Sequence, residues 1–166
     1  MDRELRKLLD EHTNNIVKQY QIAGITPAAV MSYILSEMAT AIGGRNWEAC
    51  YTLLAMARAI EDPEVKADVL NGLLVMPGHE LHQEVTMEIQ RLKSPSSVPY
   101  IRSVLEGGFD FLAYTSSDDE VIAKWFSHAL AKIGTPDAIE VIKEFSVADN
   151  AGIAEEMSYR LEKLAI

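Results

Sequence analysis

Apolar residues recur at spacings of three and four along almost the whole chain, and short polar corners containing glycine or proline separate these runs. This period is typical of amphipathic helices, and no alternation of apolar and polar residues is long enough to predict a strand. The expected helices cover about residues 2–20, 27–42, 47–60, 63–76, 79–93, 95–106, 118–133, 136–145 and 151–164.

One corner, at residues 134–137, shows how the helices are separated. Gly134 suits the left-handed conformation that ends a helix, and Thr135 can accept a hydrogen bond from the first amides of the next one. Pro136 fits a first helical turn, and Asp137 places negative charge at its positive end. A residue able to cap a helix precedes proline at four places: Thr26-Pro27, Asp62-Pro63, Ser94-Pro95 and Thr135-Pro136.

The apolar stripes also superpose on one another at fixed shifts. With a shift of 31, Ile122, Phe126, Leu130 and Ile133 fall on Ile153, Met157, Leu161 and Leu164. With a shift of 41, Leu92, Pro95, Val98 and Ile101 fall on Ile133, Pro136, Ile139 and Ile142. The difference of ten matches an aperiodic segment that begins at Gly107. A repeat unit of about 31 residues with one insertion explains both shifts.

The motif Leu-x-x-Ile-Gly-Thr-Pro-x-Ala-Ile-x-x-Ile at residues 130–142 resembles the HEAT-like repeats of bacteria. The resemblance implies an all-α fold, a right-handed α-α superhelix of HEAT-like helix pairs with about nine helices. We therefore expect one solenoid domain over residues 1–166, with capping helices at 1–45, repeat helices at 46–166 and an insertion at 107–117. An irregular helical bundle with proline caps is the alternative.

Charge and cysteine content narrow the classes of function. The 166 residues include 25 acidic and 15 basic side chains, a formal charge of -10 that disfavours nucleic-acid partners and repair enzymes with a basic groove. Cys50 is the one cysteine, which excludes an intrachain disulfide and a zinc site of several thiolates. Without a signal-like N-terminus or a membrane-spanning run, we expect a cytoplasmic protein that has no membrane partner.

Few residues suggest reaction chemistry. His79 and His82 lie three apart, whereas zinc proteases need a spacing of four, so we expect polar residues on an exposed first turn. Ser127 and His128 could join an acid in a catalytic set, but no nucleophile elbow supports this, and His128 is expected at the surface or half-buried. Cys50 lies on an apolar stripe and is expected in the core. We predict no catalytic, metal or cofactor residues.

The insertion is the best candidate for a contact site, because insertions in solenoids usually lie in accessible loops. It carries aromatic residues and leads into three consecutive carboxylates. The predicted partner-binding residues are Phe111, Tyr114, Asp118, Asp119 and Glu120. As an alternative, Phe109, Phe111 and Leu112 fold back as a short extra helix that plugs the stack, and the carboxylates only stabilise a helix start.

These features predict a non-enzymatic protein-binding module whose partner has a basic surface. An immunity or inhibitor protein for a basic bacterial toxin, such as a nuclease, would fit, because carboxylates can occupy a site meant for phosphates. A scaffold or adaptor in a larger assembly is the alternative. A lyase-like or metal-dependent enzyme is a more remote alternative.

Overall fold

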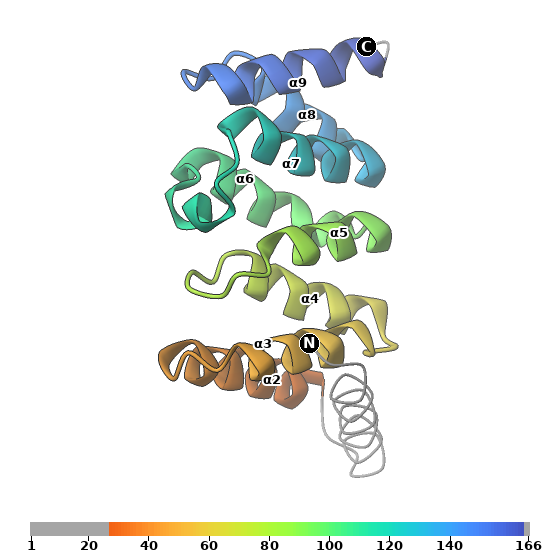
Figure 1. The fold of residues 1–166 in the computed structure, drawn as a ribbon. Coiled ribbons are helices and arrows are strands. Elements are labelled where there is room, and N and C mark those ends of the chain that lie inside the picture. Colours follow the sequence, from red (N-terminus) through yellow and green to blue (C-terminus); the bar gives the residue numbers. More distant parts are fainter. Residues whose placement is uncertain (1–26, 165–166) are drawn as a thin grey trace, which may run out of the picture. The chain divides into compact units, whose positions relative to one another are not determined.

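The computed structural model describes residues 27–164, and every regular element within that range is helical (Figure 1). The elements are α2 (Pro27–Gly43), α3 (Trp47–Arg58), α4 (Pro63–Leu74), α5 (His82–Leu92), the 3₁₀ helix η1 (Pro95–Ser97), α6 (Val98–Gly107), the 3₁₀ helix η2 (Asp110–Thr115), α7 (Asp119–Ile133), α8 (Pro136–Phe145) and α9 (Ala151–Lys163). The all-α prediction is confirmed. The expected helix over 2–20 and the Thr26 cap lie outside the described residues.

None of the helices within residues 27–164 combines the length and apolar character that crossing a lipid bilayer requires. The chain divides into two compact units, residues 1–81 and 82–166. In the first unit, α2 packs against both α3 and α4. The largest side chains buried between these three helices are Ile34, Met38, Leu54, Leu70, Leu73 and Leu74.

The second unit is built from two rows of helices. In one row α7 packs between α5 and α9, and in the other α6 packs against α8 (Figure 1). Asp119 at the start of α7 bonds to Asn150, just before α9, while Ser127 bonds to Glu156, so α7 and α9 run parallel. Asp119 and Asn150 are 31 residues apart, the same shift that superposes the apolar stripes of these two helices.

Side-chain caps begin several of the described helices. Asn46, Asp62, Thr135 and Asn150 each accept a hydrogen bond from a backbone amide of the helix that follows, and the sequence predicts the Asp62 and Thr135 caps. Gly134 ends α7 with φ at 68°, the left-handed conformation expected from the sequence.

The Ser94-Pro95 corner differs from the others. Ser94 caps the 3₁₀ turn η1, and α6 begins only at Val98. Pro99 fits there because the amides of a first helical turn have no intrahelical partner. The expectation that one helix runs directly from Pro95 is therefore wrong by three residues.

Candidate functional site

The insertion after α6 folds as the 3₁₀ helix η2 and contributes to the core of the second unit. Leu112 is fully buried, and Phe109 is buried with its ring 5.9 Å from that of Phe126. Phe111 is half-buried, and its ring is nearly perpendicular to that of His82, with 5.1 Å between the centroids. The plug alternative therefore holds for Phe109 and Leu112, while Phe111 lies at the boundary between core and solvent.

Tyr114 joins the insertion to the start of α5. Its hydroxyl accepts the backbone N–H of His82 at 3.0 Å and lies 2.9 Å from Nδ1 of the same residue. The Tyr114 oxygen therefore contacts both the backbone and the ring of His82, and ties η2 to the first residue of α5. Tyr114 as a whole keeps 38% of its surface exposed, so a partner can reach part of it.

Asp118, Asp119 and Glu120, here called the acidic corner, lie at the start of α7. All three are exposed, and within residues 27–164 no lysine or arginine pairs with any of them. Asp119 Oδ2 accepts a hydrogen bond of 2.7 Å from Asn150 Nδ2. The carboxylates also interact favourably with the positive end of the α7 dipole. Helix stabilisation is therefore a second reason for acidic residues at these positions.

Gly152 lets α9 approach this corner closely. A Cβ atom at residue 152 would lie 2.8 Å from the Glu120 backbone nitrogen and 3.2 Å from Asp119 Cβ. Only glycine avoids that overlap, because a backbone atom cannot swing aside as a flexible side chain can. Asn150 and Gly152 together hold the start of α7 against α9.

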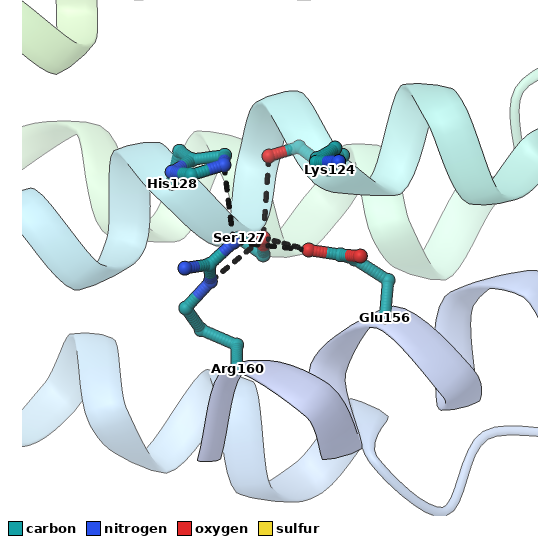
Figure 2. Close-up of polar contacts among 5 residues, drawn as sticks. All are labelled: Lys124, Ser127, His128, Glu156 and Arg160. Carbon is teal, nitrogen blue, oxygen red and sulfur yellow. Dashed lines mark hydrogen bonds and ion pairs between the residues drawn. The ribbon is translucent and has the colours of Figure 1, made fainter. Parts of the chain in front are cut away.

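A second polar cluster lies farther along the same two helices, inside the unit. Figure 2 shows Ser127 and His128 on α7 meeting Glu156 and Arg160 on α9. The Ser127 hydroxyl donates to Glu156 Oε1 at 2.7 Å, with the Lys124 carbonyl 3.2 Å away as a second acceptor. Arg160 donates to Glu156 at 3.2 Å and to Ser127 at 3.3 Å. Glu156 and Ser127 are buried, and their partners compensate the cost of burying them.

His128 is half-buried at the edge of this cluster, as expected from the sequence. Its Nε2 lies 3.0 Å from Arg160 Nη2, and because arginine has only donors, Nε2 must be the acceptor. The ring is therefore neutral, with its proton on Nδ1. Burial and the charge of Arg160 lower the pKa of His128 below its ordinary value of 6.5, while Glu156 opposes them.

The cluster brings a serine, a histidine and an acid together but does not align them for nucleophilic catalysis. The Ser127 hydroxyl donates to Glu156, and the His128 nitrogen that could accept a serine proton is bonded to Arg160. Sequence reasoning missed Glu156 and Arg160. The available signal was an acid and a base spaced i, i+4 on a helix whose other face is apolar.

The expectation for His79 and His82 was wrong, because both side chains are buried. α5 begins at His82, so His79 precedes the helix. His79 Nε2 donates to the Leu73 carbonyl at 2.7 Å, and Nδ1 accepts the Leu81 N–H at 3.1 Å. In the described part of the chain, no three residues among His, Cys, Asp and Glu form a group that could hold a metal ion.

Cys50 is buried in α3, as its place on the apolar stripe predicts. Burial raises the pKa of its thiol above the ordinary value of 9.0, and a backbone hydrogen bond opposes the shift. The thiol is therefore protonated at neutral pH and a weak nucleophile there.

The surface of the second unit is hollowed between neighbouring helices. A groove of about 540 Å³ lies along the contact of α6 with α8, where Arg102 donates two hydrogen bonds to Glu144. A smaller pocket of about 190 Å³ lies between α5 and α7, and His128 and Trp125 form part of its wall. The smaller one has room for a side chain rather than for a typical small-molecule ligand.

Comparison with known proteins finds no family model, no curated protein and no solved structure that matches this chain. The second unit holds three features that bear on function: the exposed acidic corner, the partly exposed Tyr114 and the close contact of α9 with α7.

Proposed function

We propose that this chain is a non-enzymatic protein-binding module that uses the acidic corner to bind a basic protein surface. One observation carries the proposal: three consecutive exposed carboxylates, Asp118, Asp119 and Glu120, pair with no lysine or arginine of the described chain. Unpaired like charges repel one another, so a cationic partner gains both attraction and relief of that repulsion.

The corner is held in place before any partner arrives. Asn150 bonds to Asp119, and Gly152 lets the backbone of α9 lie directly against Glu120. A site that is already ordered loses little conformational entropy on binding, which favours affinity. Tyr114 and Phe111 come from η2, which directly precedes the corner in the chain, and partly exposed aromatic rings are the usual anchors of protein interfaces.

The wider architecture in this proposal is a stack of HEAT-like helix pairs. The parallel contact of α7 with α9 at a shift of 31 residues supports it, because stacked repeats place equivalent residues side by side. The proposed partner is a basic bacterial toxin such as a nuclease, with this chain as its immunity or inhibitor protein in the cytoplasm. The net charge of -10 supports this choice, because carboxylates can occupy a surface built for phosphates.

The test is binding of the full chain to a basic protein encoded beside its gene. The triple variant Asp118→Asn, Asp119→Asn, Glu120→Gln removes three charges and keeps an oxygen at residue 119 that Asn150 can donate to. The control variant Glu37→Gln, Glu61→Gln, Asp68→Asn removes the same charge from exposed residues of the first unit. We expect the corner variant to raise the Kd about tenfold or more and the control to change it much less.

Equal effects of the two variants on the Kd would show that net charge alone attracts the partner. This result would contradict the proposal that the partner binds at the acidic corner. Loss of inhibition of the toxin in the corner variant, with inhibition kept in the control, would support the narrower immunity assignment. Co-purification of the chain with several subunits, each unaffected by the corner variant, would favour a scaffold or adaptor instead.

A further inference from the structure

One hydrogen bond between α7 and α9 is accepted by a histidine, which must be uncharged to accept it. His128 Nε2 accepts a hydrogen bond of 3.0 Å from Arg160, and the same guanidinium also donates to Glu156 and Ser127. Arg160 therefore bonds to three residues at once, two on α7 and one on its own helix. No nucleophile, metal or bound group is needed to explain this arrangement.

Protonation of His128 would change the contact in two ways. It would turn the accepting Nε2 into a donor, and two donors cannot share one hydrogen bond. It would also place a second positive charge 3.0 Å from the nitrogen of Arg160. Both changes favour separation of the two side chains.

The charged groups that act on the His128 ring all lie on α7 and α9. Arg160, Lys124 and Lys132 oppose its protonation, and Glu156 favours it. The α5 side chains that line the pocket beside His128 do not ionise: Gln83, Thr86, Met87 and Gln90. Three cations and one carboxylate act on the ring, so the net electrostatic effect of these charges disfavours an imidazolium. The one carboxylate, Glu156, already bonds to Arg160 and Ser127.

We propose that His128 is an acid-sensitive latch between the last two helices of the row: protonation of its ring displaces Arg160 and releases α9 from α7. Displacement of Arg160 destabilises the docked α9 because Glu156 is buried: the carboxylate is then left with Ser127 as its one hydrogen-bond partner. Hydration of the Glu156 carboxylate then favours a state in which α9, which bears this residue, has moved away from α7. The proposal is independent of what binds the acidic corner.

The direction of the effect follows from the lowered pKa of His128 in the folded chain. The undocked state binds the proton more readily than the docked state. The free energy that favours docking of α9 is therefore at its full value above the ordinary pKa of 6.5, and it decreases as pH falls below 6.5. The ratio of docked to undocked α9 falls by up to about tenfold per pH unit in that window, until the folded pKa is reached.

The test is amide hydrogen exchange of the full chain between about pH 7.5 and about pH 5, corrected for the intrinsic exchange rates and read out in peptides that cover α9. In His128→Gln the amide oxygen can accept from Arg160 but does not titrate. We expect the protection of α9 to fall on acidification in the wild type, by up to about tenfold per pH unit below pH 6.5, and to change little in His128→Gln.

Ser127→Ala is the matched control. It weakens the same contact without removing the titrating group, so its α9 should be less protected at both pH values and keep the wild-type pH dependence. An α9 whose protection does not depend on pH in the wild type would overturn the proposal. Equal loss of protection on acidification in the wild type and in His128→Gln would also overturn it, because another group would then be responsible.

Discussion

Gly152 lies so close to Glu120 that a Cβ added to the glycine would come within 2.8 Å of the Glu120 backbone nitrogen. We therefore expect Gly152→Ala to lower the free energy of unfolding by about 1–3 kcal/mol, because the start of α9 must move away from α7. Urea denaturation followed by circular dichroism measures this change.

Gly107 provides the control for that substitution. It lies in the last turn of α6, and a Cβ there would meet nothing within 4 Å. Gly107→Ala should be neutral or raise the unfolding free energy by about 0.5–1 kcal/mol, because alanine is the better helix former. If both alanine variants behaved alike, the close approach of α9 to α7 would be contradicted.

The buried pair of Glu156 and Arg160 leads to a second prediction. Arg160→Met leaves the Glu156 carboxylate buried with one partner fewer, and we expect a loss of about 3–5 kcal/mol. The double variant Glu156→Leu, Arg160→Met removes both charges and should be less destabilised than Arg160→Met alone.

The exposed pair of Arg102 and Glu144 serves as the comparison for the buried one. Each side chain keeps nearly half of its surface exposed to solvent, although Glu144 raises the pKa of Arg102. Arg102→Gln should therefore change the urea midpoint little, since water screens the pair. A large loss in Arg102→Gln together with a small one in Arg160→Met would reverse our ranking of the two pairs.

Tyr114 gives a third prediction through its hydroxyl. Tyr114→Phe keeps the ring but removes the oxygen that accepts from the His82 backbone and bonds to Nδ1. We expect a loss of about 1–3 kcal/mol in unfolding free energy and faster hydrogen exchange in η2. Unchanged exchange in η2 would mean that Phe109 and Leu112 alone hold the insertion.

A fourth prediction concerns Cys50, whose burial raises the pKa of its thiol above 9.0. The folded state holds the proton more tightly than the unfolded state, so stability from this group is full below pH 9.0 and is lost as pH rises through the folded pKa. Wild type should lose stability at alkaline pH more steeply than Cys50→Ala. Iodoacetamide should alkylate the native thiol slowly and the urea-unfolded thiol quickly.

The helical elements could be predicted from the sequence because their determinants are local. The 3.6-residue period and the caps at Asn46, Asp62 and Thr135 depend on residues close in the chain. The same locality explains the error at Ser94. The sequence pattern of a cap before proline does not distinguish the start of a 3₁₀ turn from that of an α-helix.

The polar clusters could not be predicted because they depend on tertiary contacts. Ser127 and Glu156 are 29 residues apart, and His82 and Tyr114 are 32 apart. A polar residue on a helix suggests exposure until a partner from another helix is known to meet it, which is why His82 was misplaced. The acidic corner lies where the sequence predicts it, at the start of a helix, and its role in binding stays a prediction.

A basic protein that binds as proposed covers the acidic corner and the insertion before it. Hydrogen exchange of the full chain, with and without the basic protein encoded beside its gene, tests this directly, because bound backbone amides exchange more slowly. We expect added protection over residues 110–121, strongest at the start of α7. Protection confined to α2, α3 and α4, with residues 110–121 unchanged, would contradict it.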